Sequence, residues 1–194
     1  MNGVATGQAD SPVIRKARMT DIAPLLELIN GYADMGIMLP RSEVELAEGI
    51  RDFTVAACAG RLVACGALHF YGPAAAEVRS LAVHPLWKSH GVGRRLVEAL
   101  EQEAVEHGLG FVFAFTYVPG FFQKLGFVEV DRAELPSKVW KDCLRCPKFQ
   151  CCDEVAVRKK LVANEGISTT PVCGDKLRSG LHPLEEAVLL PIVR

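Results

Sequence analysis

Apolar residues recur along the chain with two kinds of spacing, which predict helices and strands. Apolar positions three and four residues apart predict a helix for which Thr20 and Asp21 supply an N-cap and an acidic first turn, and another helix over 90–107. Ser42 and Glu45 form a capping-box pattern that predicts the start of a short helix at Ser42. Continuous or alternating apolar runs predict strands, and Pro and Gly mark their ends. These strands cover 13–17, 53–58, 62–70, 77–83, 111–116, 127–130 and 153–162, with further helical turns at 121–125 and 138–146.

The order of these elements predicts one mixed α/β domain without internal repeats. We place this domain at 13–162. Residues 1–12 are small and polar and are expected to form a loose leader. Residues 163–194 show no clear period and contain several prolines, so they are assigned as an extension whose order the sequence does not define.

Composition narrows the class of protein. The 194 residues are 49% hydrophobic and carry a formal net charge of −1, with 22 Lys and Arg against 23 Asp and Glu. Nucleic acids and acidic membranes need clustered basic residues, so neither partner is expected. The first residues lack the basic and apolar regions of a signal peptide, and no apolar run reaches the ~20 residues of a membrane helix. We therefore expect a cytoplasmic protein.

The segment 77–98 carries the clearest chemical signal. A strand ends at Val83, a loop contains Gly91 and Gly93, and an amphipathic helix follows at once. Glycines at a helix start let a phosphate approach backbone N–H groups that have no acceptor within the helix. The same spacing also fits a tight turn without a ligand, and a lone Gly-x-Gly does not decide between the two.

Residues 88–93 resemble the Gln/Arg-x-x-Gly-x-Gly/Ala signature of the Gcn5-related N-acetyltransferase (GNAT) superfamily, with Lys88 at the first position. Residues 119–127 resemble the family segment that closes over the thiol end of coenzyme A. The resemblance implies a single GNAT-like α/β (α+β) domain with a mixed, mostly antiparallel central sheet flanked by helices. It also implies acetyl-CoA as co-substrate, with its diphosphate on the loop. The implied contacts are Leu81, Ala82, Val83, Lys88, Ser89, His90, Gly91, Val92, Gly93, Arg94 and Phe122.

The segments 38–42, 77–85 and 135–138 together resemble the acetyltransferase domain of the N-acetylglutamate synthases, in the short form that lacks an amino-acid-kinase domain. This resemblance implies acetylation of the α-amine of L-glutamate, the first step of arginine biosynthesis, and a homodimer. Two alternatives remain open. The chain could acetylate another small amine, or it could be a non-catalytic module that binds CoA or senses thiols or metal.

Family positions also suggest the catalytic groups. Glu77 lies eleven residues before Lys88, where several relatives carry a general base, and the backbone N–H of Leu81 is the candidate to polarise the thioester oxygen. The period-2 rule predicts that Glu77, Arg79 and Leu81 share one face of the strand. Many relatives have a tyrosine acid where this chain has Phe122, which has no proton to donate. Either Tyr117 substitutes for it, or the thiolate leaves unprotonated.

A glutamate substrate has two carboxylates, so its site should present basic side chains in a partly desolvated cleft. Arg41 and Arg79 are the candidates, and Ser42 would add a hydroxyl if capping does not use it. Lys138 is a third candidate. The competing interpretation is that both arginines are solvated or pair with nearby glutamates. His84 could relay protons, but a His-Pro pair at a strand end is more often structural.

Four cysteines lie within ten residues: Cys143, Cys146, Cys151 and Cys152. One C-x2-C pair is half of a common zinc or iron–sulfur motif. A second pair is missing, the last two thiols are adjacent and no histidine lies nearby. We therefore expect free or redox-active thiols here and no bound metal.

Overall fold

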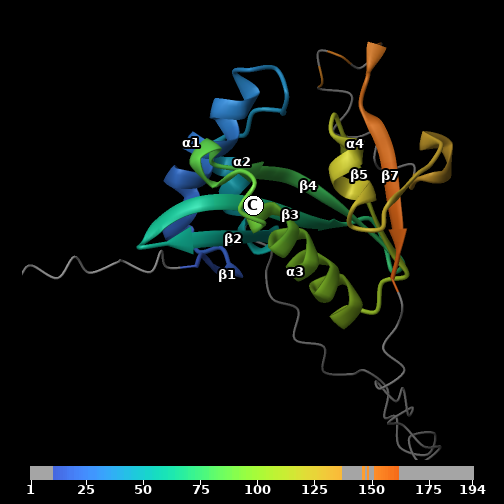
Figure 1. Cartoon of the computed structure of the whole chain (residues 1–194), viewed down its shortest axis with the longest axis horizontal. Helices are drawn as coiled ribbons and strands as arrows, with labels where there is room; N and C mark the ends of the chain where they lie inside the picture. The colour runs from blue at the N-terminus through green and yellow to red at the C-terminus, as the bar shows by residue number, and fades with distance from the viewer. Residues whose placement is uncertain (1–10, 137–145, 147, 149–150, 162–194) are drawn as a thin grey trace, which may run out of the picture. The chain divides into compact units, whose positions relative to one another are not determined.

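The computed structural model describes residues 11–136, 146, 148 and 151–161 (Figure 1). These residues fall in the first of the two units into which the chain divides, 1–163. The strands are Val13–Lys16 (β1), Phe53–Cys58 (β2), Arg61–Phe70 (β3), Ala75–Val83 (β4), Phe111–Thr116 (β5), Val128–Glu129 (β6) and Val155–Lys160 (β7). The α-helices are Ile22–Ala33 (α1), Glu43–Glu48 (α2), Val92–Glu106 (α3) and Pro119–Gln123 (α4). Short 3-10 helices occur at Met19–Asp21 (η1), Ile50–Asp52 (η2), Pro85–Trp87 (η3) and Arg132–Glu134 (η4).

The seven strands form one sheet in the order β1-β2-β3-β4-β5-β7-β6. Every neighbouring pair is antiparallel except β4 and β5, which are parallel. The predicted α/β fold with a mixed, mostly antiparallel sheet is therefore confirmed. The helix predicted at 138–146 falls almost wholly outside the described residues.

Helices pack on both faces of the sheet (Figure 1). On one face, α1 and α2 bury Leu25, Ile29 and Leu46 against β2 and β3. On the other face, the buried stripe of α3 and the aromatic residues of the α4 region cover β3, β4, β5 and β7. This second cluster includes Val97 and Leu100. The predicted amphipathic stripe of α3 is confirmed, since its apolar residues are the buried ones.

The caps of the first two helices differ from each other. Ser42 and Glu45 form the predicted capping box, in which the Ser42 Oγ accepts the Glu45 N–H at 3.2 Å and the Glu45 carboxylate accepts the Ser42 N–H at 2.9 Å. The predicted side-chain cap of α1 is wrong, because Asp21 makes no such bond. Its carboxylate instead accepts two hydrogen bonds from Arg15, at 2.7 and 2.9 Å, and one from the Arg18 N–H at 2.7 Å. This pairing holds the pKa of Asp21 below its usual value.

Candidate functional site

The centre of the sheet opens between β4 and β5. Their parallel ladder contains only the rungs Ala75–Phe111, Ala76–Val112 and Glu77–Phe113. Beyond Glu77, β4 continues to Val83, and beyond Phe113, β5 continues to Thr116. The facing edges of these two strand ends are therefore not paired with each other in the described ladder. Such an edge offers backbone N–H and C=O groups to an extended ligand.

A β-bulge interrupts β4 inside this open part. Arg79 pairs with Ala67 and Ala82 with Cys65, so two residues, Ser80 and Leu81, lie opposite one residue of β3. Ser80 has a φ of 50°, which turns the strand. The residue opposite the bulge is Gly66, where an added Cβ would lie 3.1 Å from a Leu81 methyl carbon. Glycine at this position therefore gives the Leu81 side chain its room.

The bulge changes the sheet face on which the residues after Arg79 lie, so the predicted alternation does not hold beyond it. Glu77 and Arg79 lie on the sheet face that carries α1 and α2, whereas Leu81 packs on the opposite face with Leu100 of α3. The expectation that Leu81 shares a face with the other two is therefore wrong, because the extra residue inverts the period. A bulge also takes its residues out of the regular ladder, which suits the Leu81 N–H to a role outside the sheet.

The loop after β4 contains residues with positive φ, a backbone conformation that its glycines favour. Ser89 has a φ of 65° and Gly91 a φ of 74°, and Gly91 is the residue that precedes α3. The first hydrogen bond of the helix runs from the Arg95 N–H to the Gly91 carbonyl at 3.1 Å. The N–H groups of residues 92–94 thus have no acceptor within the helix, and they lie at its positive end. This geometry can bind a phosphate.

Side chains brace the loop from several sides. The Lys88 ammonium lies 5.1 Å from the centre of the Tyr32 ring, and the Tyr32 hydroxyl donates to the Val83 carbonyl at 2.5 Å. His90 Nδ1 lies 2.7 Å from the Lys88 carbonyl. His84 Nδ1 accepts the Leu86 N–H at 3.3 Å, which is a local capping contact. Tyr32 therefore joins α1 to the end of β4, and nothing in the sequence pattern pointed to it.

The structure separates the two adjacent phenylalanines of α4. The Phe122 ring is 4% exposed and belongs to the core under α3, with the Phe127 ring 5.1 Å away. The prediction that Phe122 contacts CoA is not supported, because its ring lies inside the core. Phe121 is partly exposed, and its ring would lie 3.5 Å from a Cβ added at Gly93. Phe121 is therefore the aromatic side chain that lies against the glycine loop.

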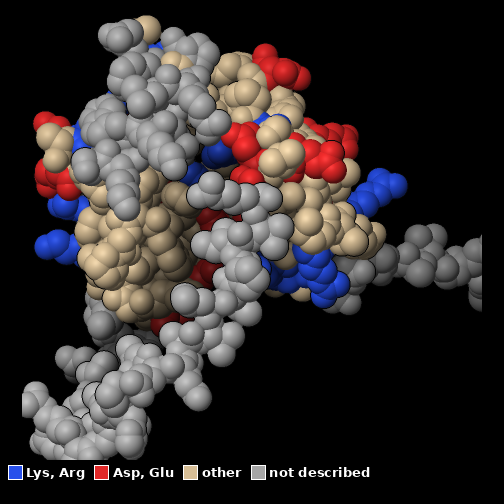
Figure 2. Space-filling model, turned by 180° about the vertical axis from the view of Figure 1, so that it is seen from behind, with Lys and Arg blue, Asp and Glu red and all other residues tan. Residues whose placement is uncertain are grey.

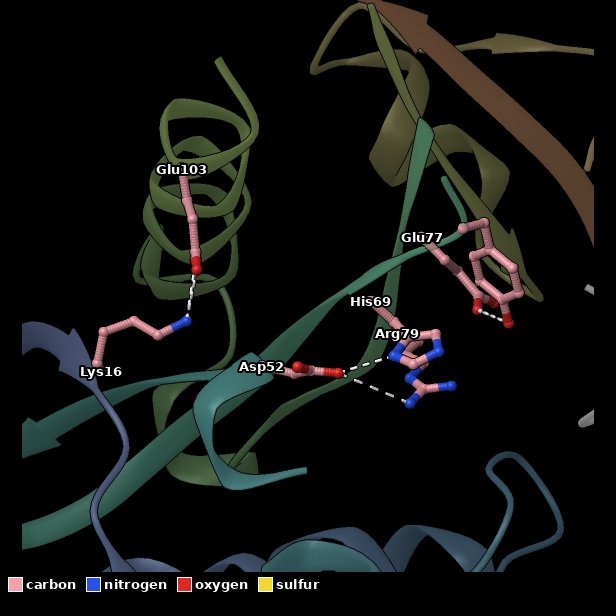
Figure 3. Close-up of polar contacts among 7 residues, drawn as sticks. Lys16, Asp52, His69, Glu77, Arg79 and Glu103 are labelled. Carbon is pink, nitrogen blue, oxygen red and sulfur yellow. Dashed lines mark hydrogen bonds and ion pairs between the residues drawn. The ribbon is translucent and has the colours of Figure 1, made fainter. Parts of the chain in front are cut away.

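Glu77 lies at the last rung before the strands separate. Its carboxylate accepts a hydrogen bond from the Tyr71 hydroxyl at 3.1 Å (Figure 3). This hydrogen bond fixes the position of one carboxylate oxygen, and an ionised carboxylate can accept hydrogen bonds at both of its oxygens. Tyr71 was missed in the sequence, where it appears only as a turn residue after β3.

A second polar group lies next to Glu77 on the same face. His69 of β3 pairs with Glu77 in the ladder, and its Nδ1 lies 2.8 Å from the Asp52 carboxylate at the end of η2 (Figure 3). Arg79 lies 3.9 Å from the same Asp52 oxygen. The rings of His69 and Tyr71 meet edge to face, 5.1 Å apart. Five polar side chains from three elements thus form one network, of which the sequence had singled out only Glu77 and Arg79.

The other predicted substrate residues lie between α1 and α2. The Asn30 side chain holds the backbone of Arg41, donating to its carbonyl at 3.0 Å and accepting its N–H at 2.9 Å. The Ser42 hydroxyl donates to Glu45 at 3.1 Å as well as accepting in the cap, so capping uses it in both directions. This use argues against Ser42 as a substrate ligand. Lys138 lies outside the described residues.

Tyr117 directly follows β5 and lies four residues beyond the last rung, about 13 Å along the strand direction. Leu81 also lies four residues beyond that rung, on β4. The Tyr117 hydroxyl accepts a hydrogen bond from the Lys148 ammonium at 3.2 Å. Partial burial raises the pKa of Tyr117, which keeps its proton in place at neutral pH.

The cysteine cluster is described only in part, since Cys143 lies outside the described residues. Cys146, Cys151 and Cys152 form no disulfide there, and the Cys152 thiol lies 3.8 Å from the Glu154 carboxylate. Within 11–136, 146, 148 and 151–161, no three His, Cys, Asp or Glu side chains are grouped as a metal site.

The described residues contain no helix with the length and apolar character to cross a membrane. Viewed from behind, charged side chains of both signs lie recessed in a hollow of the surface (Figure 2).

Comparisons with known proteins agree on one family. Residues 49–129 match the model of the acetyltransferase (GNAT) domain. The chain is 43% identical to an uncharacterized N-acetyltransferase of Chlorobaculum tepidum over 148 residues, 76% of this chain and 96% of that protein. It is 34% identical to the amino-acid acetyltransferase of Mycobacterium tuberculosis over 137 residues, 69% of this chain and 78% of that protein.

Solved structures give the same picture. N-acetylglutamate synthase from Neisseria gonorrhoeae, complexed with coenzyme A and N-acetyl-glutamate, superposes with a TM-score of 0.72 at 28% identity. The match covers 79% of this chain and 36% of that one. A Mycobacterium tuberculosis protein in complex with CoA superposes with a TM-score of 0.69 at 29% identity, over 78% of this chain and all of the other.

Proposed function

Because this chain belongs to the GNAT family of N-acetyltransferases, we propose that it transfers the acetyl group of acetyl-CoA to the α-amine of L-glutamate. The chain is an acyltransferase that acts on an amino acid, and acetyl-CoA is its donor. Membership in a family of enzymes argues against the alternative of a non-catalytic sensing module. The homodimer and the place in arginine biosynthesis stay predictions.

The donor fits the open half of the sheet. The N–H groups of residues 92–94 would hold its diphosphate, with Gly91 permitting the close approach. The unpaired edge of β4 near Val83 would pair with the pantetheine arm, as an added strand does. Phe121 would pack against the same arm beside Gly93. The thioester would then lie near Leu81, whose N–H would polarise the carbonyl oxygen.

One observation supports an amino acid as acceptor. Glu77 and Arg79 lie on one face of β4, next to the point where β4 and β5 separate. A carboxylate and a guanidinium two residues apart can receive an ammonium and a carboxylate of the same small molecule. The Arg79 side chain is 20% exposed, so a substrate can reach it while much of its surrounding water is excluded. Arg41 is the candidate for the second carboxylate.

The chemistry then assigns a task to each group. Glu77 takes a proton from the substrate ammonium, directly or through one water, so that the amine nitrogen has its lone pair. The nitrogen attacks the thioester carbon, and the Leu81 N–H stabilises the negative charge on its oxygen. The carbon–sulfur bond breaks and the sulfur leaves with the bonding electrons. The nitrogen gives up a second proton, so that one of the two protons goes to the sulfur and the other to solvent. Tyr117 is the candidate to protonate the sulfur, at the end of β5.

The test is CoA release by the purified protein with acetyl-CoA and glutamate, glutamine, aspartate or a polyamine as acceptor. We expect kcat/KM to be highest for glutamate, and mass spectrometry of that product to show N-acetylglutamate. A higher kcat/KM for glutamine or the polyamine would contradict the glutamate proposal and leave the family assignment intact. A matched reaction without acceptor measures hydrolysis of the thioester.

A further inference from the structure

His69 and Asp52 have the arrangement of a proton-accepting pair. The His69 Nδ1 lies 2.8 Å from the Asp52 carboxylate. An ionised carboxylate only accepts hydrogen bonds, so the proton in this contact belongs to Nδ1. In the neutral ring, Nε2 then carries the lone pair and can take a proton. Asp52 fixes this tautomer.

The pair lies beside the candidate base. His69 and Glu77 face each other across the antiparallel ladder of β3 and β4, so their Cβ atoms are about 5 Å apart. The His69 side chain is 37% exposed and that of Asp52 is 31% exposed, so a proton on His69 can exchange with water. The charged and titratable groups that face His69 are Asp52 from η2, Glu77 and Arg79 from β4, and Tyr71 after β3.

The reaction gives such a group a task. A substrate ammonium gives up two protons when its nitrogen becomes an amide, and the leaving sulfur takes back only one. The second proton is the one that remains on Glu77, and it must reach solvent before the next turnover. A carboxylate that keeps a proton cannot serve as base again.

We propose that His69, oriented by Asp52, is the proton relay that returns Glu77 to its ionised form by passing the second proton to solvent. This inference rests on the proposed acetyl transfer but not on glutamate as the acceptor. His69 is the relay, and Asp52 is a positioning residue that acts through it. Arg79 shares the same Asp52 oxygen at 3.9 Å, so substrate bound to Arg79 and the orientation of His69 are coupled.

The decisive variant is His69→Asn, whose side-chain amide can still donate to Asp52 but cannot carry a proton at neutral pH. We expect kcat at pH 7 to fall by at least ~10-fold, with KM for the amine changed less than ~2-fold. Imidazole in the buffer should restore turnover in this variant and leave the wild type unchanged. His107→Asn is the matched control. His107 lies at the end of α3, where its ring contacts Phe70, and it does not belong to the network around Glu77.

Each result decides the proposal. A His69→Asn kcat within twofold of wild type across the pH range overturns it, and so does a loss that imidazole does not restore, since that indicates a structural role. Thermal melting of each variant shows whether it folds, and His69→Gln serves if His69→Asn does not. All rates use the amine with the highest kcat/KM in the panel, so a wrong glutamate assignment leaves this comparison intact.

NMR spectroscopy can test the tautomer of His69 beside Asp52 without measuring turnover. The ¹⁵N chemical shifts of the His69 ring in the CoA-bound wild type should show a protonated Nδ1 and an unprotonated Nε2 when the ring is neutral. Asp52→Asn should shift this ring toward the other tautomer. A neutral His69 with its proton on Nε2 in the wild type overturns the proposal.

Discussion

The two halves of the candidate site are built in different ways. The donor half consists of the end of β4, the glycine loop and the start of α3, and the proposed contacts with acetyl-CoA are made by its backbone groups. The acceptor half consists of side chains that three separate elements bring to one face of the sheet. Backbone binding depends on where the chain turns, whereas side-chain binding depends on which residues meet.

This difference predicts different responses to mutation. A substitution in the donor half should act mainly where it changes the backbone, because backbone N–H groups make most of the proposed contacts there. A substitution in the acceptor half should remove one chemical task at a time. Substitutions in the donor half should therefore change KM for acetyl-CoA. Substitutions in the acceptor half should change kcat and KM for the amine.

The largest effect is expected at Glu77. Glu77→Gln keeps an oxygen that can accept from the Tyr71 hydroxyl but removes the basic carboxylate. We expect kcat to fall by ~10²-fold or more near neutral pH, because general bases typically contribute that much. KM for acetyl-CoA should stay near its wild-type value, as measured by CoA release. A rate within threefold of wild type would remove Glu77 from the mechanism.

The next effect is expected at Arg79, which tests whether the acceptor half selects a carboxylate. Arg79→Gln should raise KM for glutamate by ~10-fold or more, since hydrogen bonds to charged groups contribute about 1.5–3 kcal/mol. The kcat should change much less. Arg61→Gln at the exposed first position of β3 is the matched control. An unchanged KM for glutamate in Arg79→Gln would show that another group binds its carboxylates.

The donor half could be predicted from the sequence because its residues are contiguous. Strand, glycine loop and helix lie within 77–106, and the periodicity and glycines specify them without long-range information. The capping box at Ser42 was predictable for the same reason. The acceptor half was not, since Asp52, His69 and Tyr71 meet Glu77 and Arg79 only through the register of the sheet and the position of η2. Their one local signal was a polar–apolar alternation at the end of β3.

The wrong prediction for Leu81 has a single physical cause. Its face was wrong because a bulge cannot be seen without the partner strand, where Gly66 makes room for it. The sequence also does not show which of the adjacent rings, Phe121 or Phe122, the core buries. In the structure, the hydrophobic cluster under α3 takes Phe122 and leaves Phe121 beside the loop.

A matched pair of glycine variants tests the donor half. Gly91 has a φ of 74°, where a Cβ costs about 1 kcal/mol, and Gly93 has no such strain and would place a Cβ in ordinary contact, 3.4 Å from Val83. We expect Gly91→Ala to raise KM for acetyl-CoA by about fivefold and Gly93→Ala to change it less. Steady-state kinetics with varied acetyl-CoA measures both. An equal effect of the two variants would mean that contact with the ligand, and not backbone conformation, decides binding.

The smallest effect concerns the support of the bulge. The Cys65 Sγ lies 3.5 Å from the Ser80 carbonyl, and burial raises the pKa of this thiol from 9.0 to about 12. The folded protein therefore holds this proton more tightly than the unfolded chain, so the stability it contributes is complete below pH 9 and is lost as the pH rises toward 12. Cys65→Ala should lower the free energy of unfolding at pH 8 by about 1 kcal/mol, from the lost contact and volume. The difference from wild type should shrink above pH 9 in urea unfolding curves.

Alkylation tests the burial of the same thiol. In the folded wild type at pH 8, iodoacetamide should modify the exposed Cys151 and leave Cys65 unmodified. Rapid alkylation of Cys65 would show that the strand opens at the bulge.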